Sequence, residues 1–290
     1  MIIEIVEKYL RKQEKTLDFA ILQSAWKDFS YQAEKQFMSN EYDATGKLYP
    51  SSLGKCPRQV AYGYYGFPKT QRPGDRISLN MWFGNLVETG LIMLMKLAGL
   101  DIQEHQKIEF NLAGQEFRGY ADAVVTINKE KYIIEIKSLT QYGFEEFEET
   151  GFKDREDYMT QLNLYLKYAE INKGIFLVAC RNTGHIAEKC ITTDDKYLDI
   201  AQNCVKCVLQ GKENLPERMY SPDEKLAKIA GEKTIGLIDE KNKPMVSKFI
   251  FKKVLSLGWR CSYCNWVSVC FPDYKMEFVG GKPVFLRRLE

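Results

Sequence analysis

The sequence lacks a hydrophobic run long enough to cross a membrane. Its most apolar stretch, LIMLMKLAGL at 91–100, is short and is interrupted by a lysine, whereas a membrane-spanning helix needs about 20 predominantly apolar residues. The first ten residues, MIIEIVEKYL, carry charges inside their apolar stretch, which argues against a signal peptide. We therefore expect a cytosolic protein with no membrane contact.

The sequence also lacks a strong excess of charge of either sign. Its 41 Lys and Arg nearly balance 39 Asp and Glu, for a net charge of +2. This balance neither demands nor excludes nucleic acid, because acidic residues elsewhere can offset a local basic groove. At 45% hydrophobic residues the chain is well outside the composition of disordered proteins. Its 290 residues fit one large domain or a core with an appendage.

We expect helical support structure in residues 1–50 and the main domain in residues 51–290. Within the latter, a serine cap should open a helix over 51–62, and a strongly patterned helix should cover 77–100 with a core-facing stripe of Val87, Leu91, Leu94, Met95 and Ala98. A further helix is predicted over 157–170, two strands over 174–180 and 185–191, and a helix over 193–212. The charged segment at about 214–253 is weakly patterned, which favours a surface excursion.

Residues 118–139, RGYADAVVTINKEKYIIEIKSL, predict a β-hairpin with ionisable residues at unusual positions. Residues 131–138 alternate, so Glu135 and Lys137 share a face with Ile133. A short turn at 128–130 then brings Asp122 opposite Glu135. Two carboxylates converging in an apolar sheet repel each other and are costly to bury, so a cation is expected between them.

Carboxylate oxygens suit Mg²⁺ or Mn²⁺. Lys137 cannot ligate a metal while it is protonated, but it is placed to orient or deprotonate a water, or to offset charge on a phosphorane-like transition state. The alternative is an ordinary exposed Glu and Lys pair on an edge strand.

Four other residues are candidates for the same site. Glu88 borders the core-facing stripe of its helix, so it points inward unless it reaches solvent at the margin. Gln161 and Tyr165 lie one turn apart on the next predicted helix, where they can hydrogen-bond a phosphate or a carboxylate, although such a pair is often structural. Arg181 ends a strand and is placed to bind a phosphate.

The eight cysteines are more easily explained as thiols or metal ligands than as disulfides in a reducing compartment. Cys204 and Cys207 lie among valines, which favours core packing over metal binding. Cys261, Cys264 and Cys270 fall within ten residues, and three thiolates require a fourth ligand, for which Cys56 is the leading candidate. Zinc and an iron–sulfur cluster both accept four thiolates, and the spacing does not separate them.

Taken together, Gly84-x-x-x-Glu88, Gly119-x-x-Asp122, Glu135-x-Lys137 and Gln161-x-x-x-Tyr165 resemble the RecB-like branch of the PD-(D/E)XK nucleases. The one-plus-three cysteine pattern further resembles the iron-staple subgroup, which includes the AddB nuclease domain and the CRISPR-associated RecB-like exonucleases. The resemblance covers about 51–270. Many iron-staple members have histidine where this chain has Glu88, and Ala121 stands where the motif's proline would be.

The resemblance implies a restriction-endonuclease-like α/β fold, with a central mixed sheet flanked by helices and an iron–sulfur-stapled helical region. It implies that Glu88, Asp122, Glu135 and the Ile136 carbonyl ligate Mg²⁺ or Mn²⁺, that Lys137 is catalytic together with Asp122 and Glu135, and that Gln161 and Tyr165 position DNA, with Arg181 as a further phosphate contact. Cys56, Cys261, Cys264 and Cys270 would hold a [4Fe-4S] cluster, with zinc as the alternative occupant.

The function implied is a metal-dependent DNA nuclease, an exonuclease on single-stranded ends that acts in repair, recombination or phage or CRISPR DNA processing in a bacterial, archaeal or phage-infected cell. A helicase or recombinase partner is compatible with it. The alternative is a DNA-binding adaptor that keeps the nuclease fold and acts within a larger complex.

Overall fold

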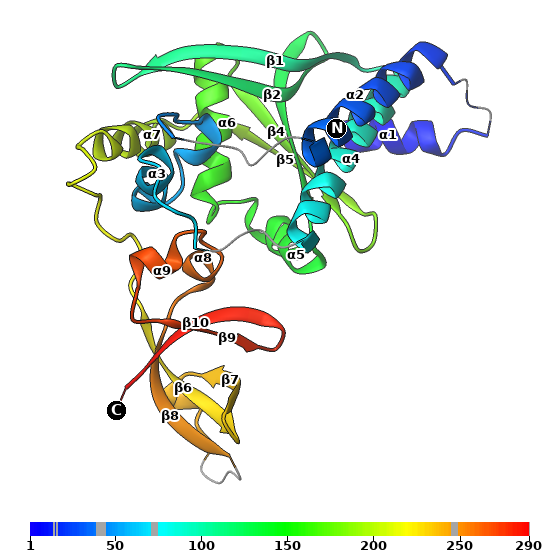
Figure 1. Cartoon of the computed structure of the whole chain (residues 1–290). Coiled ribbons are helices and arrows are strands. Elements are labelled where there is room, and N and C mark those ends of the chain that lie inside the picture. The colour runs from blue at the N-terminus through cyan, green and yellow to red at the C-terminus, as the bar shows by residue number, and fades with distance from the viewer. Residues whose placement is uncertain (14, 16, 39–44, 71–74, 245–248, 290) are drawn as a thin grey trace.

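A computed structural model describes the chain except residues 14, 16, 39–44, 71–74, 245–248 and 290 (Figure 1). The α-helices are α1 (Ile2–Leu10), α2 (Phe19–Met38), α3 (Pro57–Tyr64), α4 (Asp75–Leu97), α5 (Gln141–Thr150), α6 (Glu156–Tyr168), α7 (Asp195–Val208), α8 (Trp259–Ser262) and α9 (Val267–Cys270). The strands are β1 (Asp101–Leu112), β2 (Gln115–Ile127), β3 (Glu130–Leu139), β4 (Lys173–Cys180), β5 (Ile186–Thr192), β6 (Asp223–Ala230), β7 (Lys233–Ile238), β8 (Ile250–Ser256), β9 (Lys275–Val279) and β10 (Lys282–Arg288). Short 3₁₀ turns cover Pro50–Ser52 (η1) and Glu240–Asn242 (η2).

The first sheet is mixed and has the strand order β1-β2-β3-β4-β5. All neighbouring strands are antiparallel except β3 and β4, which are parallel. A parallel pair requires a crossover connection, and here α5 and α6 provide it. The expected mixed α/β fold with a central sheet flanked by helices is confirmed.

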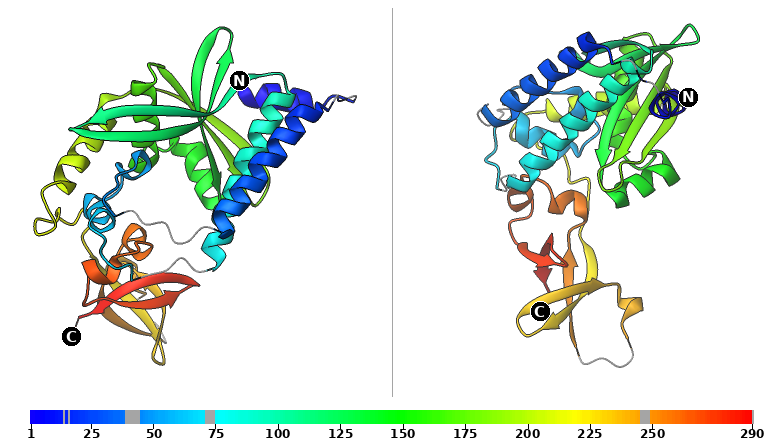
Figure 2. Two further views of the ribbon diagram at one scale, coloured as in Figure 1. Left: turned by 45° about the horizontal axis from the view of Figure 1, so that its top comes forward. Right: turned by 90° about the vertical axis from the view of Figure 1, so that its right-hand side faces the viewer.

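The two faces of this sheet bury separate cores. On one face, Ile133 of β3 and Phe176 and Val178 of β4 pack with residues of α3, α5, α6 and α7. On the other face, Ile134 and Ile136 of β3 pack with α1 and α4 (Figure 2). The expected stripe of α4 lies in this second core, where Leu91 and Met95 are buried.

Residues 214–253 do not form the expected surface excursion, because they contribute β6, β7 and β8 to a second sheet. Its strand order is β7-β6-β8-β10-β9, with β9 and β10 supplied by the C-terminal part of the chain. Figure 1 shows this sheet as a separate lobe below the first one. Its two small cores centre on Leu257, Phe271 and Phe285 and on Ala227 and Val254.

One local prediction also needs correction. The helix expected over 51–62 is a 3₁₀ turn followed by α3, and Cys56 is the N-cap of α3. The acidic segment after β3 forms α5, which buries Phe144 and Phe147 against the core and ends at Gly151 with a left-handed backbone. None of the helices in the described parts of the chain is both long and apolar enough to span a bilayer.

Gly54 lets the turn before α3 lie directly against the first turn of α6. A Cβ atom at this position would be 2.4 Å from the backbone oxygen of Glu156 and 2.7 Å from the Cα of Asp157. Backbone atoms cannot move aside as a flexible side chain can. This contact therefore fixes the segment that carries Lys55 and Cys56 against the crossover helix.

We expect Gly54→Ala to lower the free energy of unfolding by about 1–3 kcal/mol, because the added methyl overpacks a backbone contact. Gly90→Ala is the matched control, since Gly90 lies in α4 with open space around its Cα, and it should stabilise the chain by up to about 1 kcal/mol. Urea denaturation of both variants measures the difference. Equal stability of the two would contradict the packing described here.

Candidate functional site

The β2–β3 hairpin brings Asp122 beside Glu135. Asn128 and Lys129 form its tight turn with positive φ angles of 52° and 70°, the backbone geometry that suits the twist of a two-residue hairpin loop. The register pairs Ala123 with Ile134, so Asp122 and Glu135 follow as the next opposed positions. The backbone N–H of Ile136 donates to Asp122 Oδ2 at 2.6 Å.

Glu135 is the most deeply buried acidic residue of the site, with only 1% of its surface exposed. One of its oxygens, Oε1, pairs with Lys137 Nζ. Its other oxygen, Oε2, is buried without a hydrogen-bond partner among the described residues. A buried, unpaired carboxylate oxygen costs stability unless another group satisfies it, so this atom marks a position for a ligand.

The carboxyl groups of Asp122 and Glu135 are both shifted towards their neutral forms. Burial raises the pKa of Asp122 to about 7, with a further contribution from the charge of Glu88. Burial also raises the pKa of Glu135 to about 7, against the attraction of Lys137 and with added repulsion from Asp122. The third acidic group, Glu88 on α4, is therefore close enough for its charge to act on Asp122.

Lys137 is the cation of the site. Burial alone lowers its pKa, but the attraction of Glu135 and Asp122 outweighs this effect, so the pKa of Lys137 lies above its usual value. Its Nζ also lies 5.1 Å from the centre of the Tyr158 ring on α6. In this arrangement Lys137 keeps its proton and presents a positive hydrogen-bond donor.

Gln161 and Tyr165 lie on α6 beside the carboxylates. Tyr165 is 3% exposed, and burial together with the charge of Glu135 raises its pKa, against a hydrogen bond with Gln161. A Cβ atom at position 119 would be 2.7 Å from the Tyr165 Oη, so Gly119 is required for the tyrosine to lie against β2. Arg181, in contrast, is exposed just after β4, where its backbone N–H bonds to Leu139 O at 2.8 Å.

Cys56, Cys261, Cys264 and Cys270 line one small cavity of about 30 Å³, together with Tyr62, Arg260 and Phe271. Burial raises the pKa of Cys261 to about 12, and repulsion from the other three thiols adds to this shift. Burial likewise raises the pKa of Cys264 to about 11. Cys204 is only 2% exposed and packs in the first core, as the sequence predicted for it.

Among the described residues, only Asp28, Glu104 and His105 bring three ligand atoms within 4.8 Å of one another. This group joins α2 to β1. Lys96 already pairs with Glu104, and the charge of Asp28 acts on the pKa of Lys96, which burial lowers. The ammonium group of Lys96 therefore already offsets part of the negative charge of this group.

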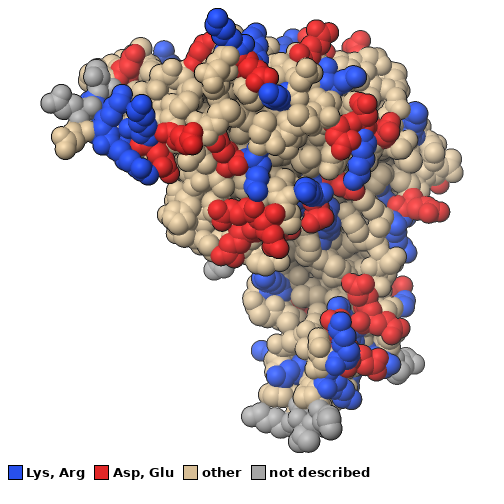
Figure 3. Space-filling view, turned by 180° about the vertical axis from the view of Figure 1, so that it is seen from behind, with Lys and Arg blue, Asp and Glu red and all other residues tan. Residues whose placement is uncertain are grey.

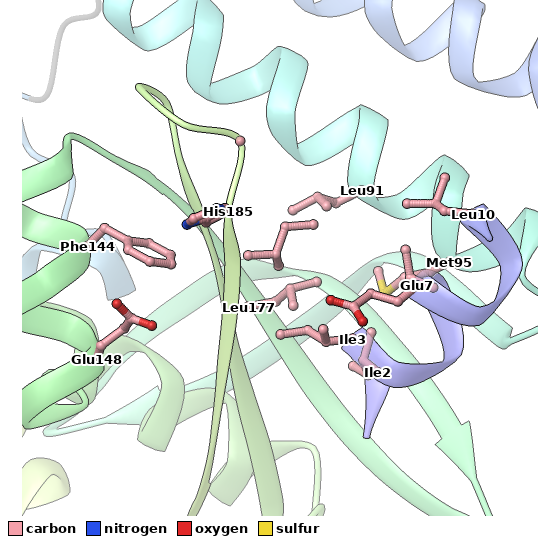
Figure 4. A pocket seen from close by; sticks show the side chains of 13 residues that line it. Ile2, Ile3, Glu7, Leu10, Leu91, Met95, Phe144, Glu148, Leu177 and His185 are labelled. Carbon is pink, nitrogen blue, oxygen red and sulfur yellow. The ribbon is translucent and has the colours of Figure 1, made fainter.

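A larger cavity of about 350 Å³ lies against α1 and is mostly apolar (Figure 4). Ile2, Ile3, Leu91 and Leu177 line it, and Glu7, Glu148 and His185 are its polar groups. Figure 4 shows His185 between α5 on one side and α1 and α4 on the other. Neither Asp122 nor Glu135 lines this cavity, so its apolar lining and the carboxylate site are separate features.

Three groups near the carboxylates were not predicted from the sequence. Tyr158 lies under Lys137, Arg155 lies 3.9 Å from the centre of the Tyr158 ring, and Lys55 is close enough for its pKa to respond to Lys137. No local pattern identifies them, because the contacts join segments that are far apart in the sequence. Tyr158 and Arg155 lie at the start of α6, and only the packing of that helix on β3 brings them to the site.

No family model and no curated protein matches this sequence. Solved structures are similar at a low level. The crystal structure of SSO0001 aligns at 22% identity and a TM-score of 0.43, covering 66% of this chain and 88% of that one. The alkaline exonuclease LHK-Exo from Laribacter hongkongensis aligns at 18% identity and a TM-score of 0.42, covering 61% and 90%. A phage-related exonuclease from Haemophilus somnus aligns at 12% identity and a TM-score of 0.31, covering 71% and 88%. These similarities assign no role to any residue of this chain.

We expect Mn²⁺ to raise the melting temperature of the protein through Asp122 and Glu135. At a hundred times the dissociation constant, binding adds about 2.7 kcal/mol of stability, which corresponds to a rise of several degrees in a chain of this size. The rise should disappear in Asp122→Asn and persist in Asp28→Asn. Differential scanning calorimetry with and without Mn²⁺ measures the change in melting temperature. If only Asp28→Asn abolished the rise, Mn²⁺ would bind at Asp28, Glu104 and His105 and not at Asp122 and Glu135.

Proposed function

We propose that this chain is a metal-dependent DNA nuclease. The observation that carries the proposal is the unpaired Oε2 of Glu135, buried beside Asp122 and Lys137. A protein gains nothing in stability from burying two acidic groups with an unsatisfied oxygen. Such an arrangement is retained where the groups bind a ligand or perform chemistry.

The donor set fits a hard divalent cation. Its atoms are carboxylate oxygens, which suit Mg²⁺ or Mn²⁺. Burial raises the pKa of Asp122 and Glu135, and a cation beside the unpaired oxygen would oppose this effect because it stabilises the charged carboxylates. Glu88, Asp122, Glu135 and the Ile136 carbonyl are the proposed ligands. When bound, the ion polarises the scissile phosphate and lowers the pKa of a coordinated water.

The other residues have roles that follow from their positions. Lys137 presents its ammonium group beside the carboxylates, where it orients the attacking water or offsets the negative charge that develops on phosphorus. Gln161 and Tyr165, from the facing side of α6, supply side-chain donors for a phosphate oxygen. Because Gly119 has no side chain, Tyr165 can lie against β2, and this contact sets the position of its hydroxyl group.

DNA is the proposed substrate, and exonucleolytic attack on a single-stranded end is the proposed mode. An alkaline exonuclease and a phage-related exonuclease are among the structurally similar proteins, and LHK-Exo has also been solved in complex with dAMP. The proposal itself rests on the carboxylates and the lysine. Membership of the RecB-like, iron-staple group, a role in repair, recombination or CRISPR or phage DNA processing, and a helicase or recombinase partner belong to the same proposal.

We expect the purified protein to cut labelled DNA with Mg²⁺ or Mn²⁺ and to be inactive with EDTA. Lys137→Ala should reduce the rate at least about 100-fold, because it removes the only cation that touches Glu135 among the described residues. Lys131→Ala is the matched control, since this lysine is exposed on the same strand, and it should cleave like wild type. Oligonucleotides labelled at either end report both rate and polarity.

The outcome that would contradict the nuclease proposal is a folded protein that binds DNA but does not cleave it with either metal. That result would favour a DNA-binding adaptor that retains the fold and acts within a larger complex. Cleavage that is unaffected by Lys137→Ala would point to a different catalytic centre.

We further propose that Cys56, Cys261, Cys264 and Cys270 hold a [4Fe-4S] cluster that joins the start of α3 to α8 and α9. These four cysteines line one cavity, and four thiolates are the ligands that such a cluster requires. Zinc, which also accepts four thiolates, is the alternative occupant.

We expect protein purified without oxygen to be brown, to contain iron and inorganic sulfide, and to show the broad absorbance of an iron–sulfur cluster. Cys261→Ala should lose the colour and the iron, whereas Cys190→Ala, which alters an exposed cysteine of β5, should keep both. A colourless wild type with stoichiometric zinc would contradict the assignment.

A further inference from the structure

Trp259, the first residue of α8, presents an exposed aromatic surface. Its side chain is 59% exposed. Trp266, seven positions later, is 8% exposed and donates its indole N–H to Phe67 O at 2.9 Å. Trp266 therefore supports the fold, whereas most of the Trp259 ring faces solvent.

Positive side chains surround this ring. The guanidinium carbon of Arg260 lies 5.1 Å from its centre and that of Arg155 lies 5.8 Å from it. Arg260 is fixed by bonds to Asp154 O at 2.6 Å and to Tyr220 Oη at 3.1 Å. Both of these acceptors are neutral groups, and the charge of Arg260 also acts on Asp157.

A continuous series of contacts links Trp259 to the catalytic lysine. Arg155 lies 3.9 Å from the centre of the Tyr158 ring, and Lys137 Nζ lies 5.1 Å from the same ring. Asp157 pairs with Arg155 at 3.0 Å. The short path places the exposed indole within a few side chains of the proposed reaction centre.

Lys55 adds a further positive charge to this path. It follows Gly54, which lies directly against the backbone of Glu156 and Asp157 in the first turn of α6, and its side chain is exposed. Asp157 therefore faces three cations, Lys55, Arg155 and Arg260.

Acidic side chains gather elsewhere on the surface. Figure 3 shows such a group in the middle of the view from behind. Helix α5 carries Glu145, Glu148 and Glu149, all exposed.

We infer that Trp259 is a stacking platform for a base of single-stranded DNA, with Lys55 and Arg260 contacting the adjoining backbone phosphates. The inference rests on the proposed nuclease function and adds a binding subsite to it. An exposed indole flanked by guanidinium groups matches the way sequence-tolerant single-strand binders combine stacking with phosphate contacts. Paired bases do not offer a free face to such a ring, so the subsite selects single strands.

The test is equilibrium binding of a fluorescent oligothymidylate in EDTA, where no cleavage occurs. Base stacking on an aromatic side chain is worth about 1–3 kcal/mol, so Trp259→Ala should weaken binding about 5- to 150-fold, and Trp259→Tyr should restore most of the affinity. Trp26→Ala, which removes another exposed tryptophan (68%) on α2, should bind like wild type.

An abasic oligonucleotide of the same length separates stacking from a structural effect. Trp259→Ala should bind the abasic backbone as wild type does, whereas Lys55→Ala should weaken binding to both oligonucleotides and reduce the slope of log affinity against log salt by about 0.7. Unchanged affinity of Trp259→Ala for oligothymidylate, or an equal loss on both oligonucleotides, would overturn the inference and leave the nuclease proposal standing. A wild type that neither binds nor cuts DNA would overturn both.

Discussion

Burial of two carboxyl groups next to one lysine is the constraint on which this structure depends. Glu135 lies almost fully inside the sheet, Asp122 accepts the Ile136 N–H at 2.6 Å, and Lys137 pairs with Glu135. Removing such groups from water costs several kcal/mol per charge, and the attraction of one ammonium group does not fully offset two carboxylates. The remaining imbalance is expressed in the raised pKa values of both acids, and a divalent cation would relieve it.

The hairpin and the crossover helices bring the residues of this site together. The tight hairpin turn fixes which residues of β2 and β3 are opposed, and the parallel β3–β4 pair obliges the chain to cross over through α5 and α6. That crossover lays α6 across the site, where Tyr165 packs against Gly119 and Tyr158 lies beneath Lys137. The start of α6 then contacts both the turn before α3, at Gly54, and Arg260 of α8. Segments from both ends of the main domain are thereby brought beside the carboxylates.

The parts that sequence patterns predicted are those governed by local periodicity. The alternation in β3 correctly separates Ile134 and Ile136 from Ile133, and the stripe of α4 identifies Leu91 and Met95 as core residues. The predictions failed where the local pattern is weak or misleading. Strand β1 was not foreseen although it forms a hairpin with β2, and α5 is too acidic to look buried although Phe144 and Phe147 anchor it. The charged strands β6 to β8 pair with one another and, through β8, with β10. The neighbours of Trp259 were also missed, since no short motif joins position 259 to 155.

We propose that a divalent ion, Mg²⁺ or Mn²⁺, binds between Asp122 and Glu135. The most direct measurement is anomalous X-ray scattering from crystals soaked in Mn²⁺. The account predicts an anomalous peak within bonding distance of both carboxylates, absent in crystals of Glu135→Gln. A peak at Asp28, Glu104 and His105 with none at the hairpin, or no peak in well-diffracting soaked crystals, would contradict it.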